Sequence, residues 1–166
     1  MRTKRFSGTG LAGLLALGMT TGAVVAAHAE ETEYKLTACG HLTTVMLQSS
    51  PDLTVQSEQV WYIIAPPATP KVFENNTGQC VGYARMMNGK RTAMGSCRWT
   101  DPDGDTFIGE SVDIPDKPGV WTFFSGTGKW KGIRGNGTYQ LLGISKPRVD
   151  GTAELCVLLT GKYALQ

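Results

Sequence analysis

The sequence predicts an all-β protein: a closed antiparallel barrel of about eight strands, held together by disulfides. Short segments rich in β-branched and aromatic residues recur along the chain, and turn residues separate them. Four cysteines follow an apparent export signal, which favours disulfide formation. Closing the sheet into a barrel leaves no strand edge exposed, and eight strands enclose an interior that side chains fill or that holds one small ligand.

Residues 1–29 have the pattern of an export signal. Three basic residues open the chain, an apolar run follows at 11–27, and an A-x-A cleavage pattern ends at Ala29. A membrane anchor is the alternative, but the run is short, and no other segment reaches the ~20 apolar residues that span a bilayer. We therefore expect export, cleavage near Ala29, and a periplasmic or extracellular protein with one barrel domain at 30–166.

Loss of the signal changes the charge of the protein. The whole chain has 16 basic and 14 acidic residues, a net charge of +2, but three of the basic residues lie in the signal. The remaining chain has 13 basic and 14 acidic residues, a net charge of −1. Nucleic-acid binding depends on neutralising phosphates. We therefore expect no nucleic-acid partner, and no segment predicts a membrane span.

Turn residues divide the chain into its expected strands. Prolines at 66–70 forbid regular pairing, and Asn-Gly or Asp-Gly pairs at 88–89, 103–104 and 150–151 indicate two-residue hairpin loops. Five glycines between 125 and 139 indicate a tight corner between strands. The expected strands are 34–38, 42–47, 58–65, 79–87, 91–100, 105–114, 120–125, 137–145 and 152–165.

One hairpin predicts a disulfide. If Asn88-Gly89 forms a type I′ loop, pairing outward along both strands places Cys80 directly opposite Cys97. This position is a non-hydrogen-bonded pair, in which Cα atoms lie ~4.5 Å apart. That distance suits a disulfide.

The other two cysteines, Cys39 and Cys156, then pair by elimination and join the first strand to the last. Free thiols or a zinc site are the alternatives. The chain has no CxxC spacing, and His41 is the only histidine outside the signal. A single histidine without a nearby nucleophile also does not indicate a catalytic triad.

The alternation of side chains assigns faces to the two hairpins between 79 and 114. One face is smaller and more apolar, so we expect it to point inward. It contains Trp99, Met86, Ile108 and Val112, which we predict to line a ligand-binding space. The aromatic residues of the chain would suit a hydrophobic ligand, and the alternative is an ordinary aromatic core.

Glu110 is the candidate catalytic residue, because it shares the inward face and would lie opposite Cys97. A carboxylate among apolar groups can serve as a general acid or base. The alternative is a glutamate at the barrel mouth that reaches solvent or pairs with an arginine. We expect Arg85 and Arg98 to point outward, so no internal partner is evident.

The turn at 101–105 contains three carboxylates, Asp101, Asp103 and Asp105. A calcium site is a weak alternative here, because an EF-hand loop has its glycine one position later and a glutamate at its twelfth position. The favoured interpretation is a solvated hairpin turn, and we predict no metal and no cofactor.

Residues 126–135, Gly-Thr-Gly-Lys-Trp-Lys-Gly-Ile-Arg-Gly, lack the Ser or Thr that follows lysine in a phosphate-binding loop. The segment resembles the Gly-[Thr/Ser]-Gly-x-[aromatic]-x-Gly-x-x-Gly motif of allene oxide cyclase-like barrels, and plant dirigent proteins carry a similar Gly-Thr-Gly-x-Phe segment. It is closer still to small exported bacterial proteins of unassigned function, which combine it with an Asp-x-Asp-Gly-Asp turn like that at 101–105. The resemblance covers about 80–139. It implies an eight-stranded barrel of the calycin and allene oxide cyclase-like type, and it transfers no catalytic residue.

These observations favour an exported, non-catalytic barrel that binds a small hydrophobic or aromatic ligand. The alternatives are a cyclase or isomerase that confines a hydrophobic substrate inside the barrel, or an interaction module that presents the proline-rich loop at 66–70 to a partner.

Overall fold

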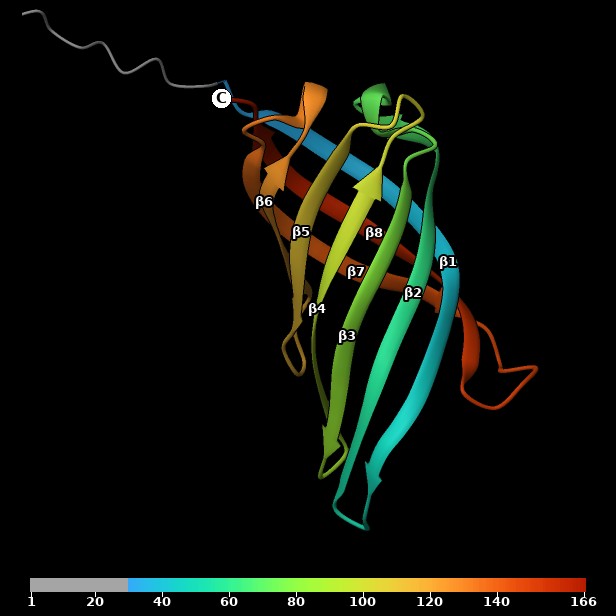
Figure 1. The fold of residues 1–166 in the computed structure, drawn as a ribbon. Coiled ribbons are helices and arrows are strands. Elements are labelled where there is room, and N and C mark those ends of the chain that lie inside the picture. Colours follow the sequence, from blue (N-terminus) through green and yellow to red (C-terminus); the bar gives the residue numbers. More distant parts are fainter. Residues whose placement is uncertain (1–29) are drawn as a thin grey trace, which may run out of the picture.

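A computed structural model of the chain describes residues 30–166, and the expected signal lies outside them. Eight antiparallel strands close into a barrel in sequence order, and β8 returns to pair with β1 (Figure 1). The prediction of a closed all-β barrel is confirmed. No helix in the described part of the chain is long and apolar enough to cross a membrane. The elements are β1 (Thr32–Ser49), β2 (Leu53–Thr69), η1 (Lys71–Phe73), β3 (Thr77–Met87), β4 (Lys90–Thr100), β5 (Thr106–Asp113), β6 (Gly119–Gly126), η2 (Gly128–Trp130), β7 (Arg134–Ile144) and β8 (Thr152–Ala164), where η denotes a single 3-10 turn.

The first two strands are longer than the sequence indicated. β1 runs without a break through two segments that were expected to be separate, and β2 includes most of the proline-rich segment 66–70. A register shift opposite Lys35 and Thr37 of β1, with the extra residues in β2, accommodates these prolines, which cannot donate to a ladder. Thr69 still pairs with Lys35, and Ala68 is buried. The prolines therefore interrupt the regular pairing, as expected, but the segment still belongs to a barrel strand and ends it.

The β3–β4 hairpin has the predicted loop and register. Asn88 and Gly89 both have positive φ, 50° and 74°, as a type I′ turn requires. Cys80 pairs with Cys97, and the two form a disulfide with Cα atoms 4.0 Å apart.

The second predicted disulfide is also present, between Cys39 of β1 and Cys156 of β8. It links the first strand to the last and so closes the barrel covalently. Two disulfides within one small domain fit an oxidising environment.

The β4–β5 connection differs from the prediction. Asp103-Gly104 does not form a two-residue loop; instead five residues, 101–105, separate the paired Thr100 and Thr106. The Asp101 carboxylate accepts hydrogen bonds from the backbone N–H groups of Asp103 and Asp105, at 2.8 and 3.1 Å, and so holds the longer turn. Because side chains alternate, this one-residue change of register reverses the two faces of β5.

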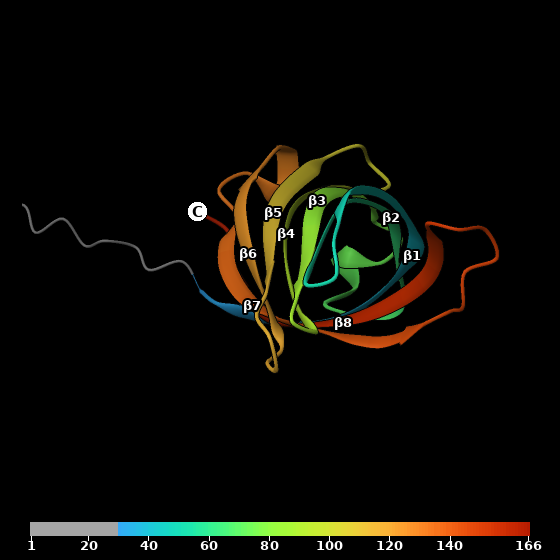
Figure 2. The same ribbon diagram turned by 90° about the horizontal axis from the view of Figure 1, so that it is seen from below.

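Aromatic side chains fill the end of the barrel that carries η1 and η2. Phe73 of η1 and Trp130 of η2 are fully buried, with ring centroids 4.8 Å apart. Trp130 also packs against Phe107 of β5 at 4.9 Å, and Phe73 packs against Tyr163 of β8 at 5.2 Å. Seen from the opposite end in Figure 2, the green turn of η1 lies across the far end of the barrel. The two short helices thus act as a plug.

The opposite end of the barrel is uneven and open. β1 to β4 extend beyond the other strands there (Figure 1). Pairing between β6 and β7 ends at Gly119 and Tyr139, so the last residues of β7 have no partner on that side. Inward positions near this end, such as Leu141 and Met86, are about half exposed to solvent. Solvent therefore reaches the interior from this end.

Candidate functional site

Charged and phenolic side chains meet inside the barrel between the aromatic plug and the open end. They are Glu58 of β2, Arg91 of β4, Asp113 of β5 and Tyr139 of β7, and each occupies an inward position in its strand. The inward residues that lie between these groups are small: Gly82 and Ala84 on β3, and Ala93 and Gly95 on β4. These small residues leave room for the long side chain of Arg91 to cross the interior. We call these four residues the interior cluster.

Arg91 is the centre of the interior cluster. Its Nη2 lies 2.8 Å from both carboxylate oxygens of Glu58, and its Nη1 contacts the carboxylate of Asp113. Gln56 donates a further hydrogen bond to Glu58 at 2.9 Å, and the Tyr139 hydroxyl donates to Asp113. One cation thus faces two carboxylates, and the side chain of Glu58 is only 15% exposed. Such bidentate and charge-assisted contacts hold the groups in a defined geometry.

The two tyrosines beside Arg91 are neutral hydrogen-bonding groups at physiological pH. Burial raises the pKa of Tyr139 to about 12, although the positive charge of Arg91 opposes this shift. Burial, with a smaller effect from the charge of Glu58, also raises the pKa of Tyr62. Both phenols therefore keep their protons and can donate to an acceptor.

An aromatic pair separates the interior cluster from the plug. Tyr62 of β2 stacks on Trp99 of β4, with ring centroids 5.9 Å apart and an interplanar angle of 17°. The indole N–H of Trp99 is buried and has no hydrogen-bond partner within the described residues. An unpaired buried donor has a free-energy cost that an acceptor on a ligand would relieve.

The structure separates the predicted ligand-binding residues. Trp99 points inward and is buried, and Met86 occupies an inward position at the open end. Ile108 and Val112 instead lie on the outer surface, because the five-residue turn reversed the faces of β5. Their predicted place inside the barrel is therefore wrong.

Glu110 is also outside. It pairs with Ser96, an outward residue of β4, and its side chain is exposed to solvent. The prediction that it faces the interior opposite Cys97 is wrong, since Gly109 takes that position. Glu110 has no access to the interior and is no longer a candidate catalytic residue.

The three carboxylates of the turn at 101–105 are occupied by protein groups. Lys129 Nζ lies 2.6 Å from Asp103 and 3.1 Å from Asp101. The Lys129 backbone N–H donates to Asp105 at 3.0 Å. An ammonium group therefore stands where the calcium alternative would place a cation, and these aspartates have a structural role.

His41 lies on the outer surface of β1. Its Nδ1 is 2.8 Å from Glu154 of β8, and both side chains are about half exposed or more. The hydroxyl of Ser145 accepts a hydrogen bond from the backbone N–H of Glu154 at 2.9 Å and makes none with His41 among the described residues.

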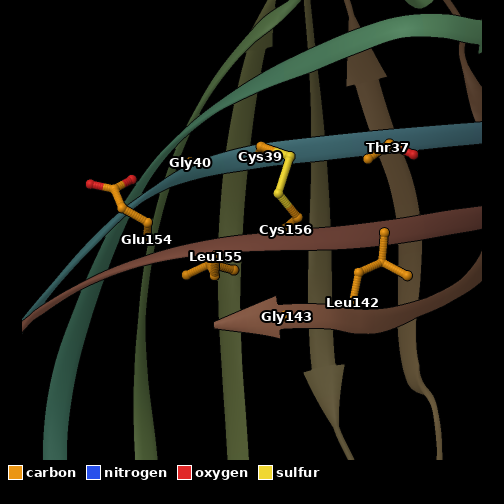
Figure 3. A pocket seen from close by; sticks show the side chains of 8 residues that line it. All are labelled: Thr37, Cys39, Gly40, Leu142, Gly143, Glu154, Leu155 and Cys156. Carbon is orange, nitrogen blue, oxygen red and sulfur yellow. A yellow bond between two sulfur atoms is a disulfide. The ribbon is translucent and has the colours of Figure 1, made fainter. Parts of the chain in front are cut away.

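A hollow of about 500 Å³ lies on the outer surface where β7, β8 and β1 run side by side (Figure 3). The Cys39–Cys156 disulfide and the side chains of Leu142 and Glu154 line it. A second hollow of about 410 Å³ lies over the glycines of β7 and β8. Glu154 is the one charged residue that lines the first hollow, and the second has the exposed pair Glu31–Lys162, 3.8 Å apart. The interior cluster joins more groups in closer contact, so it is the stronger candidate for a functional site.

Sequence reasoning missed the interior cluster. The two-residue turn expected at 103–104 would put Asp113 on the outer face of β5, and Glu58 and Tyr139 come from strands whose faces no hairpin loop assigned. A signal was available in β2, where the alternate residues Gln56, Glu58 and Tyr62 place polar groups on the face that carries the buried Ile64.

No family model and no curated protein matches the chain. Among solved structures, the pterocarpan synthase dirigent protein GePTS1 superimposes with a TM-score of 0.52 at 15% identity, over 84% of this chain and 94% of that protein. The pterocarpan synthase dirigent protein PsPTS1 gives a TM-score of 0.53 at 12% identity, over 82% and 96% of the two chains. The fold is therefore a dirigent-like eight-stranded barrel. The likeness to allene oxide cyclase-like and bacterial proteins stays a prediction.

Proposed function

We propose that this barrel binds a small aromatic ligand with hydrogen-bonding groups at the open end of its interior, and orients it without converting it. The observation that carries the proposal is the pairing of an aromatic surface with a polar wall. Tyr62 and Trp99 offer the surface, and the interior cluster around Arg91 supplies donors and acceptors. Ligand sites commonly combine apolar walls with a few fixed polar groups.

The unpaired indole N–H of Trp99 supports the same conclusion. Arg91, Tyr139 and Tyr62 are donors, and Glu58 and Asp113 are acceptors, so a phenol or a carbonyl compound would find partners of both kinds. The dirigent neighbours share this barrel architecture. Export of the chain, inferred from the signal pattern and compatible with the two disulfides, is part of the proposal.

Two measurements test ligand binding. Native mass spectrometry of protein purified from its own host should show a co-purified small molecule. Calorimetry with 2-naphthol and naphthalene as probes should show tighter binding of the phenol. Equal affinities, or no binding of either probe together with no co-purified molecule, would contradict the proposal.

A matched pair of variants locates the binding site. Arg91→Met should weaken 2-naphthol binding about 10- to 100-fold, because a hydrogen bond to a charged group contributes about 1.5–3 kcal/mol. Arg85→Met, which alters an exposed arginine on the outer face of β3, should leave binding unchanged. Arg91→Lys keeps the charge and controls for loss of folding. Equal effects of Arg91→Met and Arg85→Met would place the site elsewhere.

One observation favours the alternative of a cyclase or isomerase. The interior cluster holds two carboxylates and a phenol around one guanidinium, and such groups can move protons in a confined substrate. In that case the co-purified molecule would change its mass or spectrum on incubation with fresh protein. The conversion would be lost in Asp113→Asn. Recovery of the unchanged molecule supports the non-catalytic function.

A further inference from the structure

A row of exposed apolar side chains crosses four neighbouring strands on the outer surface of the barrel. A row of laterally paired residues crosses β3, β4, β5 and β6 through Tyr83, Met94, Val112 and Val120. These four side chains are 37–48% exposed. The same row continues into β7 and β8 with threonines, Thr138 and Thr160.

Further apolar side chains extend this row along the strands. Val81 precedes Tyr83 on β3, Ile108 precedes Val112 on β5, and Trp61 lies on the neighbouring β2. All three are exposed. Monomeric proteins rarely expose contiguous apolar patches of more than a few hundred Å², and larger ones mark interaction sites. We call this surface the β2–β6 face: Trp61, Val81, Tyr83, Met94, Ile108, Val112 and Val120.

Charged residues on the β2–β6 face indicate which partner it fits. Arg98 of β4 and Glu110 of β5 lie on the same face of adjacent strands, two residue pairs apart, since Arg98 pairs with Ile108 and Glu110 with Ser96. Arg85 lies at the edge of the face, beyond Tyr83. Among the described residues, which make up the whole barrel, none forms an ion pair with Arg85, Arg98 or Glu110.

A lipid surface or a wholly apolar partner would take Arg98 and Glu110 out of water and supply no polar group to pair with either, at a considerable cost in free energy. A second copy of the chain, related by a twofold axis that lies in the plane of the contact and passes between Arg98 and Glu110, presents the same two charges in reverse order. Glu110 of each copy then faces Arg98 of the other, and the apolar side chains of the two faces pack against each other. The face is self-complementary in both charge and apolar character.

We propose that the β2–β6 face is the contact between two copies of this protein in a twofold symmetric dimer. Ile108 and Val112 lie in the apolar part of this contact, and Glu110 forms its ion pairs with Arg98 of the other copy. The contact lies on the outer surface, separate from the interior cluster. A test that contradicts the dimer therefore leaves the proposed ligand site unaffected, and the reverse also holds.

Sedimentation equilibrium of the oxidised protein over a range of concentrations tests the proposal. The wild type should have the mass of two chains. Met94→Lys should raise the dissociation constant about 10- to 100-fold, because it buries an unpaired charge at the centre of the contact. Thr138→Lys, in the same row but on β7 and outside the β2–β6 face, is the matched control and should leave the dimer intact. A monomeric wild type, or equal effects of the two lysine variants, would overturn the proposal.

A charge exchange tests the pairing of Glu110 with Arg98. Glu110→Arg and Arg98→Glu should each weaken the dimer, since each places like charges opposite one another. The double variant should restore the mass of two chains. Circular dichroism and oxidised disulfides in each variant confirm folding. A double variant as weak as the single ones would show that the two residues do not meet across the contact and would overturn the proposed geometry.

Discussion

The carboxylate of Asp101 accepts a hydrogen bond from the indole N–H of Trp130 at 2.7 Å, and both side chains are buried. This bond joins the Asp-rich turn after β4 to the glycine-rich corner before β7. Lys129 and Asp105 add a second connection between the same two segments. Gly128 has a positive φ of 48°, and a Cβ there would lie within 2.1 Å of the Asp105 carboxylate. The two sequence motifs therefore form one structural unit that fixes Trp130 in the plug.

Asp101→Asn should destabilise the protein by about 2–4 kcal/mol. The amide can still accept from the turn backbone, but its NH₂ group would face the donors of Trp130 and Lys129. Asp103→Asn is the control, because the side chain of Asp103 is exposed and its pair with Lys129 contributes little. Urea unfolding of both variants measures the difference, and equal midpoints would show that the buried carboxylate has no special role.

The stability of the protein should decline in acid partly through Asp101. Burial alone would raise the pKa of this carboxyl, but hydrogen bonds from Lys129, Trp130 and the turn backbone outweigh burial and hold it below its ordinary value of 3.8. A lowered pKa stabilises the fold above the unfolded value, and this contribution is lost as the pH falls through the folded value. The urea midpoint of the wild type should therefore fall more between pH 5 and pH 2 than that of Asp101→Asn. Parallel declines in the two proteins would contradict this assignment.

Gly109→Ala should destabilise the protein by more than ~2 kcal/mol, because a Cβ at this inward position would lie 2.1 Å from the ring of Trp121. Gly143→Ala is the control, since nothing lies within 4 Å of the Cβ position there. The comparison also tests the register of β5. With the two-residue turn that the sequence suggested, residue 109 would point to solvent and alanine would be tolerated. Thermal or urea unfolding distinguishes the two outcomes.

The two disulfides should differ in their reaction with a thiol reductant under native conditions. Cys80 and Cys97 point into the barrel and are buried, whereas Cys39 and Cys156 are partly exposed and line the outer hollow. Because thiol–disulfide exchange requires access to sulfur, the Cys39–Cys156 bridge should be reduced first. Differential alkylation followed by mass mapping measures the order. Earlier labelling of Cys80 and Cys97 would contradict their inward orientation.

The sequence predicted one hairpin register correctly and the next one wrongly, although the two turns look alike. Asn88-Gly89 forms its loop from backbone preferences alone, so its register follows from the sequence. Asp103-Gly104 carries a similar signal, but the Asp101 side chain binds two backbone N–H groups and lengthens the turn to five residues. Lys129 and Trp130 cover the buried side chain of Asp101, and both come from a segment more than twenty residues away along the chain. The residues of the turn at 101–105 alone therefore cannot predict this long-range contact.

The candidate site was less predictable than the fold. Glu58, Arg91, Asp113 and Tyr139 lie on four strands, and only closure of the barrel brings them together. None of them belongs to a recognisable motif. Alternation in β2 could have suggested Glu58, whereas the contact between Asp113 and Tyr139 depends on the register of β5, β6 and β7 together.

The plug formed by Phe73 and Trp130 makes the barrel blind-ended. Any molecule that reaches the interior must enter and leave through the open end of the barrel, past the long hairpins of β1–β2 and β3–β4. The residence time of a bound molecule then depends on these two hairpins, because the molecule cannot pass through the barrel to the other end. Mutations at the tips of these hairpins should change the association and dissociation rates of a ligand without altering the side chains of the interior cluster.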